Sequence, residues 1–531
     1  MKAVAEWKEI ALAGTLVFML FAADCTAADR MESEGFSPRR SASRPEEAGP
    51  LQLTAEDAVL MALENNRSLV VERFTPEIKR TFEEQERAVF DPVLEAGAAF
   101  SRDKSETTAG SRGLSTRTQT GMDLGISKRL PTGAEVGVEL EATRNEIDDH
   151  SGRYAARVGL NFTQALLRGR GRGVNLASLR QARLDTQASE YELRGFAESL
   201  AARTEQAFWD YVLARRSLLI YQESLRLAER QLLETREMVA VGRLAETELV
   251  AARAEVALRR QELIDAENMY ALARLILLRL LSPRGPGLWD REVLAMDRPS
   301  VPEADLGEVE EHVELAMQMR PDLNQARLLE ERDELEVVKT RNGILPRLDL
   351  FVSLGRTGYA ESFGSAADDI PDDGYDLAAG LNLRFDLGER DSRARLERAE
   401  LSREQAREAL DNLAELVEMD VRKAYIVLQG ARQQITASRA TLDLEQEKVR
   451  IETEKFRVGR STSFMVAQAQ RDLVRARIQE INAVVEYLNA LVELHRQDGS
   501  LLERLGVDAP GRGIPAGVGS NQGAVRGDKG P

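Results

Sequence analysis

The chain has 531 residues, of which 30% are charged and only 5% are aromatic, and its formal net charge at pH 7 is −17. Few aromatic and many charged residues argue against one large compact core and favour long helices. The acidic balance argues against nucleic acid as a partner, because binding phosphates requires a basic surface.

Residues 1–28 have the features of an export signal. Lys2 and Lys8 precede an apolar run over residues 11–23, and small residues follow at 25–28. The run is too short to cross a bilayer. Cys25, the only cysteine, also raises the alternative of a lipid-anchored start, although Asp24 before it fits such processing poorly. With at most one thiol in the mature protein, disulfides are not expected to stabilise it.

The rest of the chain is predicted to contain two copies of one unit. Identical residues recur at two fixed offsets. The offset is 254 residues for Leu69 and Leu323 and for Pro92 and Pro346, and it is 217 residues for Ala182 and Ala399, Gly242 and Gly459, and Tyr270 and Tyr487. We place the copies at residues 51–282 and 306–505, joined by a proline-rich linker at 283–305. The polar segment 29–50 and the Gly- and Pro-rich tail 506–531 are expected to be disordered.

Each copy is predicted to open with one helix, at residues 53–89 and 306–342, and a proline follows each helix. Strands come next, because apolar and polar residues then alternate with a period of two. The clearest alternation runs over residues 376–387 of the second copy, and residues 154–163 of the first copy are equivalent. About a dozen alternating residues can cross a bilayer obliquely as a barrel strand.

The first copy also contains a hairpin that the second copy lacks. Alternating residues at 122–126 and 136–142 flank the turn Pro131-Thr132-Gly133, and longer polar loops lie at 105–117 and 145–153. Short turns at one end and long loops at the other are typical of outer-membrane barrels. We therefore predict four strands from the first copy and two from the second. No later stretch contains 18 consecutive apolar residues, so any membrane segment must consist of strands.

A helix of about 65 residues is predicted after the strands of each copy. Apolar residues recur there with a seven-residue period, which predicts supercoiled helices; they are Ile220, Leu227 and Val241 in the first copy and Ala437, Leu444, Ile451 and Val458 in the second. From Ala182 to Gly242 such a helix extends on the order of 90 Å. Each helix then turns at a Val-Gly-Arg triplet and returns, because glycine readily adopts the geometry of a helix end.

Arginine and glycine alternate from Arg168 to Gly173, between strand and helix. This run lacks the Lys-Ser/Thr pair of a phosphate-binding loop, so we interpret it as a contact with lipid headgroup phosphates at the periplasmic interface. No catalytic constellation is predicted, because His150, His312 and His495 are scattered and no metal-ligand spacing is present. We therefore expect no enzyme activity, no cofactor and no metal.

The order of these segments resembles the TolC-like family of outer-membrane efflux proteins, the outer membrane factors. The resemblance covers about residues 51–506 and rests on the duplicated order together with four motifs. These are Arg320-Pro321-Asp322-Leu323, the helix end at Leu345-Pro346, the stretch from Leu160 to Gly169, and the two Val-Gly tips. The family implies an α+β membrane protein: a homotrimer whose strands close one outer-membrane β-barrel, which a periplasmic α-helical coiled-coil tunnel continues.

The resemblance also implies the function and its residues. Such a channel passively conducts substrates to the exterior from a periplasmic adaptor (membrane fusion) protein and an inner-membrane RND, MFS or ABC pump. The residues implied in adaptor docking are Val241, Gly242, Arg243, Val458, Gly459 and Arg460, and those implied in the tunnel constriction are Thr247, Glu248, Phe464, Met465 and Gln468.

At the constriction, the resemblance implies that Glu248 forms an acidic ring of three. Met465 and Gln468 stand where better-known members place carboxylates, so we expect a partly apolar constriction rather than a cation-binding acidic gate. The alternative for Met465 is that it is simply a packed helix residue.

Three alternatives remain open from the sequence. The same outer component serves type I protein secretion, and a soluble periplasmic coiled-coil structural protein would lack the membrane strands. The usual family plan of four strands per chain gives a barrel of twelve strands, in which the hairpin at 121–143 would lie outside the wall. Six strands per chain would instead give eighteen.

Overall fold

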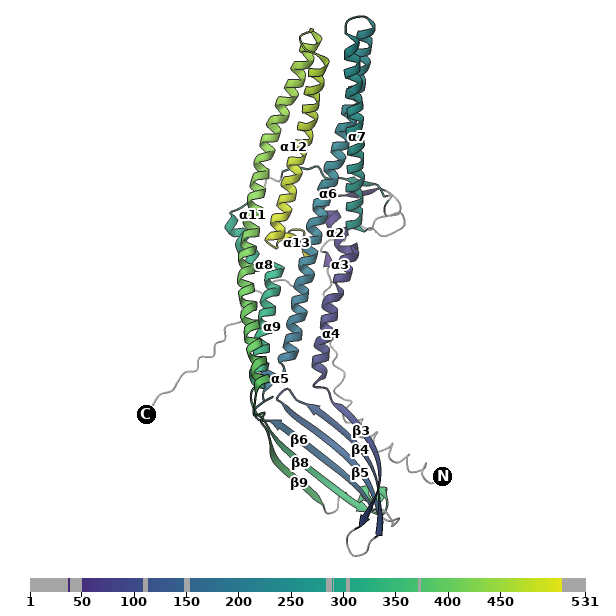
Figure 1. The fold of residues 1–531 in the computed structure, drawn as a ribbon, viewed down its shortest axis with the longest axis vertical. Coiled ribbons are helices and arrows are strands. Elements are labelled where there is room, and N and C mark those ends of the chain that lie inside the picture. The colour runs from purple at the N-terminus through teal and green to yellow at the C-terminus, as the bar shows by residue number, and fades with distance from the viewer. Residues whose placement is uncertain are drawn as a thin grey trace, which may run out of the picture.

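The computed structural model describes residues 50–107, 113–147, 153–282, 289, 291–301, 306–370 and 374–508, and the backbone of Ser37 and Pro38. The expectations for the export signal, Cys25, His150, nearly all of the segment 29–50 and the tail beyond residue 508 lie outside the described residues, as do residues 283–288, 290 and 302–305 of the linker. The polar loops predicted at 105–117 and 145–153 are shorter than predicted, because only residues 108–112 and 148–152 lie outside the described part and the other residues pair in strands. The molecule is elongated, with a sheet at one end and two helical hairpins that extend to the other (Figure 1).

The opening helix of each copy is broken, so the prediction of one continuous helix is wrong. The first copy contains α2 (Ala55–Asn65), α3 (Arg67–Glu72) and α4 (Phe74–Ala88). The second contains α8 (Val309–Met319) and α9 (Pro321–Gly343).

Both copies break at the same place, with almost the same backbone geometry. Asn66 has φ −61° and ψ 123°, and Arg320, 254 residues later, has φ −62° and ψ 124°. Arg320 is extended because Pro321 follows it and occupies the first position of α9. Asn66 has no following proline, and its side chain instead caps α3 by accepting from the backbone N–H groups of Ser68 and Leu69.

The sheet is antiparallel throughout and contains the predicted six strands. Their order is β3 (Val93–Thr107), β4 (Gly113–Arg129), β5 (Ala134–Ile147), β6 (Arg153–Ala165), β8 (Arg347–Ala360) and β9 (Tyr375–Arg384). Four strands come from the first copy and two from the second, which confirms the predicted division. The hairpin β4–β5 lies inside the sheet, between β3 and β6.

The pairing register separates an apolar face of the sheet from a polar one. Val138 pairs with Ile126 on one side and with Leu160 on the other, and Leu160 pairs in turn with Leu354. The alternate residues form the opposite face, where Glu141 pairs with Asp123 and Arg157. Since side chains alternate along a strand, this pattern continues across all six strands.

Two long antiparallel hairpins rise from the sheet. The first consists of α6 (Ala177–Ala240) and α7 (Glu246–Leu281), preceded by the short α5 (Arg172–Asn175). The second consists of α11 (Arg390–Arg457) and α12 (Ser463–Gln497), followed by α13 (Leu501–Arg504). The long helices α6 and α11 have 64 and 68 residues, which confirms their predicted length.

The seven-residue period is present, but the residues predicted to mark it do not pack within the chain. Leu444 and Val458 of α11 are 71% and 69% exposed, and Val241 of the first copy is 71% exposed. The inward positions of α11 alternate at spacings of three and four residues, as in a coiled coil; they are Ile435, Ser438, Leu442, Glu445 and Val449. The helix α11 therefore has two stripes with a seven-residue period, a mixed internal one and an apolar exposed one.

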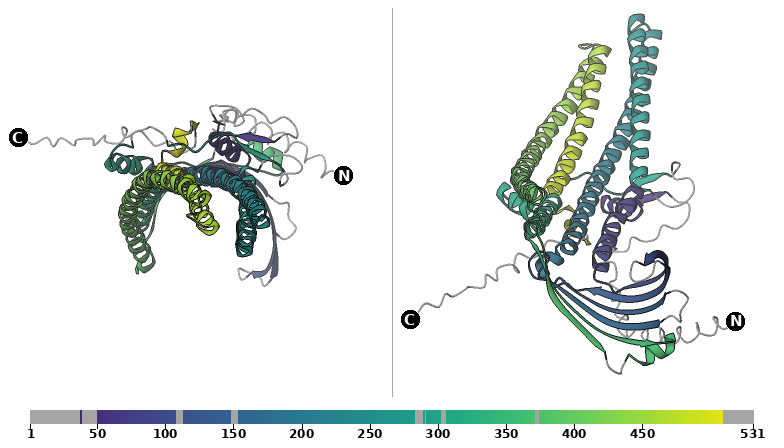
Figure 2. Two further views of the ribbon diagram at one scale, coloured as in Figure 1. Left: turned by 90° about the horizontal axis from the view of Figure 1, so that it is seen from above. Right: turned by 60° about the horizontal axis from the view of Figure 1, so that its bottom comes forward.

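The helices and the sheet form one curved wall (Figure 2). In the half near the tips, the order along the wall is α11, α12, α6, α7, and near the sheet it is α11, α9, α6, α4. One lateral edge therefore consists of α11 and β9, and the other consists of α7, α4 and β3.

The main core lies halfway along the helices. It surrounds Phe208, Tyr211 and Tyr487, and the Tyr211 hydroxyl donates to the backbone oxygen of Val293 at 2.5 Å. Val293 belongs to β7 (Val293–Ala295), which pairs in parallel with β2 (Leu51–Leu53). Smaller segments complete the fold: α10 (Phe363–Asp368) beside β8, and β1 (Ser37–Pro38), which pairs with β10 (Val507–Asp508).

None of the helices in the described part of the chain combines the length and the apolar character needed to cross a membrane.

Candidate functional site

The two helical tips have the same backbone structure. Gly242 and Gly459 both have φ +74°, a conformation that glycine adopts without strain. The N–H of Arg243 donates to the oxygen of Met238 at 2.9 Å, and the N–H of Arg460 donates to the oxygen of Lys455 at 2.7 Å. Each hydrogen bond closes the end of a long helix in the manner of a Schellman motif.

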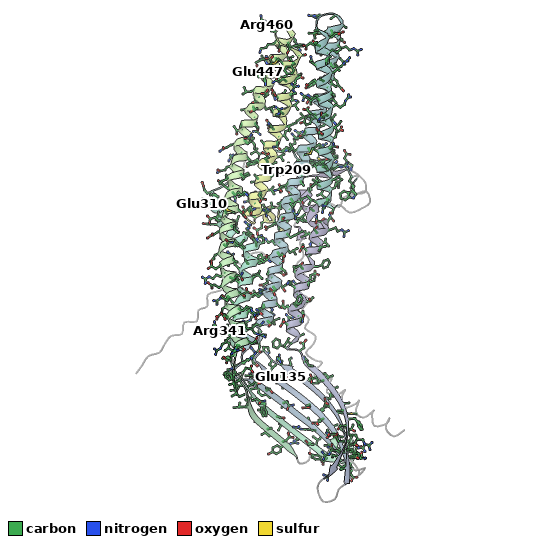
Figure 3. The ribbon with its side chains drawn as sticks, in the orientation of Figure 1. Glu135, Trp209, Glu310, Arg341, Glu447 and Arg460 are labelled. Carbon is green, nitrogen blue, oxygen red and sulfur yellow. The ribbon has the colours of Figure 1, made fainter. Side chains whose placement is uncertain are left out.

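The side chains predicted to dock an adaptor all lie at the surface of the tips. Val241 and Val458 are 71% and 69% exposed, and Arg243 and Arg460 are also exposed. Arg460 lies at the far end of the second hairpin from the sheet (Figure 3). Within the described residues, neither arginine side chain forms an ion pair or a hydrogen bond, so each presents a free guanidinium beside an exposed valine.

The predicted constriction residues are only partly brought together in one copy of the chain. Glu248, at the start of α7, accepts a hydrogen bond from the hydroxyl of Ser463 at the start of α12, and this bond joins the two tips. The guanidinium carbon of Arg471 lies 5.7 Å from the centre of the Phe464 ring. The side chains of Thr247, Met465 and Gln468 are exposed. Met465 is 45% exposed, so within one copy it is not packed as a core residue.

A ladder of charged side chains continues from the tips towards the core. Arg471 of α12 contacts Glu255 of α7 at 2.7 Å, and Glu255 also contacts Arg259 at 2.9 Å. Arg259 is 2% exposed and pairs with Glu262 at 2.9 Å as well. A buried guanidinium is stable only when carboxylates surround it, and both carboxylates of Arg259 lie on α7 itself. The pair between Arg471 and Glu255 connects α7 with α12.

The sequence analysis missed this ladder. The spacing of Glu255, Arg259 and Glu262 on one helix is visible in the sequence as an i, i+4 and i, i+3 pattern. The partner of Glu255 across the helices, Arg471, lies on α12, 216 residues further along the chain, and the periodicity of α7 carries no information about it.

The second tip has capping bonds that the first lacks. The side chain of Thr462 accepts from the backbone N–H of Met465 at 3.4 Å. The hydroxyl of Ser461 donates to Glu452 at 2.8 Å, and Lys455 also contacts Glu452 at 2.7 Å. The hydrogen bond from Lys455 lowers the pKa of the Glu452 carboxyl. At the first tip, Ala245 precedes α7 and provides no side-chain cap.

A buried polar cluster lies where α12 ends against α8. His312 contacts the Asp498 carboxylate through Nδ1 at 2.8 Å and the backbone oxygen of Leu306 through Nε2 at 2.9 Å. The hydrogen bond to Asp498 raises the pKa of His312, whereas burial lowers the pKa of His495 to about 4. Asp498 is fully buried and also accepts from the backbone N–H of Ser500. These bonds hold the chain reversal after α12.

An ion pair between α6 residues lies close to this cluster. Arg194 and Glu198 are each 3% exposed and lie 3.2 Å apart. Burial raises the pKa of Glu198 to about 8. Both side chains are buried where α6 packs against the end of α12. In the part of the chain that the structure describes, no group of three or more His, Cys, Asp and Glu side chains could hold a metal ion.

The arginine-glycine run forms the connection between β6 and α6. The side chain of Asn175 donates to the backbone oxygens of Gly169 and Gly171 at 2.7 and 2.8 Å, and the N–H of Gly169 donates to Asn342 at 2.7 Å. Arg168, Arg170 and Arg172 are exposed. The loop thus lies at the junction of sheet and helices, close to Arg341 and Glu135 (Figure 3). Contact with lipid headgroups stays a prediction.

Residues 313–500 match the family model described as outer membrane efflux protein. Among solved structures, the outer membrane channel CmeC of Campylobacter jejuni is 16% identical with a TM-score of 0.64, over 88% of this chain and 93% of that one. The outer membrane protein VceC of Vibrio cholerae is 16% identical with a TM-score of 0.60, over 84% and 96%. The MtrE outer membrane channel of Neisseria gonorrhoeae is 18% identical with a TM-score of 0.58, over 88% and 96%. No curated protein sequence matches the chain.

The structural likeness shows the fold, which is that of outer-membrane channels, in which a β-barrel is continued by a helical tunnel. The family match in the second copy agrees with this fold. Residues 313–500 thus share sequence features with outer membrane efflux proteins, and most of the chain shares the fold of outer-membrane channels.

Proposed function

We propose that the protein is the outer-membrane channel of a tripartite efflux system and conducts substrates passively to the exterior. The observation that carries this proposal is the single curved wall, which runs from the sheet to the tips and is open at both lateral edges. Such a wall encloses a passage only when further copies complete it. Passive conduction requires no catalysis by the chain, so we propose no enzyme activity and assign the energy supply to an inner-membrane pump of the RND, MFS or ABC class.

The sheet edges fit a second copy of the chain. Of the described strands, β3 and β9 are the two at the ends of the sheet, and each is paired along one side only. β3 leads away from the helices and β9 leads back to them, so β9 of one copy can pair antiparallel with β3 of the next. An open edge in a membrane would leave backbone groups unsatisfied, and closing the barrel removes both edges.

The helical edges also fit a second copy, because both carry exposed apolar side chains. On α11 these include Met419, Ile426 and Leu444, which are 54%, 68% and 71% exposed. The opposite edge carries a matching series on α4 and α7, each of them more than half exposed; its members are Phe74, Ile78, Phe82, Ile264, Leu272 and Ile276. Exposed apolar stripes of this length indicate protein contacts. Three copies are expected from the family resemblance, and a homotrimer would bury both edges.

The tips are the proposed docking site for a periplasmic adaptor protein. Each tip combines an exposed valine with a free arginine, and the two tips repeat this arrangement with the same backbone structure. Six such tips per trimer would form a ring. In the proposed closed state Thr247, Glu248, Phe464, Met465 and Gln468 line the tunnel end, where the bond between Glu248 and Ser463 holds the two tips of one copy together.

Charge reversal at the tips tests the docking assignment. The variant Arg243→Glu with Arg460→Glu should abolish export of a pump substrate, while heat-modifiable trimers and outer-membrane fractionation stay unchanged. The matched control is Arg230→Glu with Arg432→Glu, which changes exposed arginines on α6 and α11 away from the tips and should export normally. Normal export by the tip variant, with trimers intact, would show that the tips are not the docking site.

A further inference from the structure

The hairpin β4–β5 is built into the junction between the sheet and the helices. Its turn contains Gly133, which has φ +86°, and a Cβ added there would lie 2.1 Å from the backbone oxygen of Gly169. The N–H of Gly171 donates to the oxygen of Thr132 at 3.0 Å, and the N–H of Ala165 donates to the oxygen of Gly133 at 3.1 Å. The turn is thus bonded to the connection that leads into α6.

The two strands of the hairpin are fully integrated into the sheet as well. β4 pairs with β3 from Gly113 to Ser127, and β5 pairs with β6 from Ala134 to Asn145. The apolar side chains of the hairpin continue the apolar face of its neighbours, with Leu124 opposite Leu140 and Leu140 opposite Val158. A hairpin outside the barrel wall would have neither this register nor this anchored turn.

The width of the sheet matches the width of the helical wall. Four helices end at the junction, α4, α6, α9 and α11. Helices packed about 8–10 Å apart cover an arc of about 32–40 Å. Six strands spaced about 4.8 Å apart and tilted by about 40° cover about 38 Å, whereas four strands would cover only about 25 Å.

We propose that the β4–β5 hairpin sets the bore of the barrel: six strands from each of three copies close an eighteen-stranded barrel as wide as the helical tunnel. This inference rests on the proposed trimeric channel. The backbone diameter of such a barrel is about 36 Å, against about 24 Å for twelve strands at the same tilt. The barrel then adds no constriction, and the size of the cargo is limited at the tips alone.

Electron microscopy of the purified full-length protein tests this inference directly. The expected result is a trimer whose barrel is about 36 Å across at the backbone. A trimer with a barrel of about 24 Å, or with the hairpin outside the wall, overturns the inference and leaves the proposed channel standing. A monomer, or a closed ring of another number of copies, overturns the proposed trimer itself.

A deletion of residues 113–147 adds a second comparison, because it joins β3 to β6 and keeps the antiparallel order. The trimer of the deletion variant should have a barrel about two-thirds as wide as that of the intact protein. In planar bilayers, the largest polyethylene glycol that can enter it from the outer side should therefore be smaller than for the intact trimer. An unchanged size cut-off contradicts the inference. Should the deletion not assemble, the diameter of the intact trimer still decides the question.

Substitution of the turn glycine tests the anchor without removing the hairpin. Gly133→Ala should lower the temperature at which the trimer dissociates, because the added Cβ meets the Gly169 backbone at a positive φ. The matched control is Gly121→Ala in the same hairpin, whose Cβ would meet no atom closer than Thr143 at 4.0 Å. Equal dissociation temperatures for the two variants would show that the turn is not anchored.

Discussion

The two copies of the repeat agree at their tips and differ in what surrounds them. Gly242 and Gly459 have the same φ of +74° and the same closing hydrogen bonds. The helix α7 that returns from the first tip lies at a lateral edge of the wall, whereas α12, returning from the second tip, lies inside it between α11 and α6. The common turn indicates a shared requirement for two ends of equal shape. The different surroundings show that the second hairpin packs between helices of this chain, whereas α7 of the first hairpin forms one of its edges, which the proposed trimer would cover.

The buried arginine of the first hairpin gives the largest expected difference between the copies. Arg259 stands where the second copy has Ala476, 217 residues later, and both positions are buried. Arg259→Ala should destabilise the protein by about 3 kcal/mol, because breaking a buried ion pair leaves its partner charge uncompensated. Thermal unfolding of the purified protein measures this effect.

A neighbouring arginine provides the control for that substitution. Arg260 is 65% exposed on its side chain and contacts Glu229 at 3.5 Å. Arg260→Ala should change stability by less than about 0.5 kcal/mol, as expected for an exposed pair. If Arg259→Ala is equally mild, the buried ion pairs of Arg259 on α7 do not stabilise the first hairpin.

The tip glycines should respond alike, and this similarity is the sharpest test of their equivalence. Gly242→Ala and Gly459→Ala should each cost about 1–2 kcal/mol, since both force an alanine into the left-handed region. An added Cβ meets no atom within 4 Å at either tip, so strain in the backbone is the only expected cost. Hydrogen exchange of the amides at the two helix ends measures it. Unequal costs would mean that the tips differ in a way that their backbones do not show.

The smallest expected effect comes from the titration of His312, which stands in the second copy where the first has Ala58. The hydrogen bond to Asp498 raises the folded-state pKa of His312 above its ordinary value near 6.5. The bond therefore contributes its full stabilisation to the free energy of unfolding below pH 6.5, and this stabilisation is lost as the pH rises through the raised pKa of His312. His312→Gln should remove this loss of stability above pH 6.5 in thermal unfolding series.

His495 is the matched control for that series. Its folded-state pKa is about 4, below the ordinary value, so its titration affects stability only as the pH falls from 6.5 towards 4. His495→Gln should therefore leave the profile above pH 6.5 unchanged. If the unfolding temperature of the wild type and of His312→Gln changes in the same way above pH 6.5, the bond between His312 and Asp498 does not cause the loss of stability.

Much of the site could be predicted from the sequence because its signals are local. The positive φ at Gly242 and Gly459 follows from a glycine at the end of a long helical pattern. The alternation that predicts the strands is likewise contained within each strand. The sequence analysis predicted neither break in the opening helices, although the signal for the break at Arg320 is local, since Pro321 follows it. The equivalent break at Asn66 depends on a side-chain cap, which the sequence alone did not distinguish from an ordinary asparagine within a helix.

Other features could not be predicted because they depend on which elements become neighbours. The heptad series with Leu444 and Val458 predicted supercoiled helices without saying what this series packs against. In the structure these side chains are exposed, and the internal stripe contains Ile435 and Ser438. Two stripes with the same period cannot be distinguished until the neighbouring helix is known. The bond between Glu248 and Ser463 joins residues 215 positions apart for the same reason.

The sequence by itself determined the duplicated order, the number of strands, the length of the long helices and the geometry of the tips. These properties follow from periodicity and backbone preference within single elements. Only the tertiary structure decided that the hairpin β4–β5 lies inside the sheet, which stripe of α11 faces inward, and that the wall is open at α11 and β9 on one side and at α7, α4 and β3 on the other. Those features result from the packing of segments that are distant in the sequence. Such packing depends on the shape and polarity of both contacting surfaces, and the pattern within one segment describes only one of them.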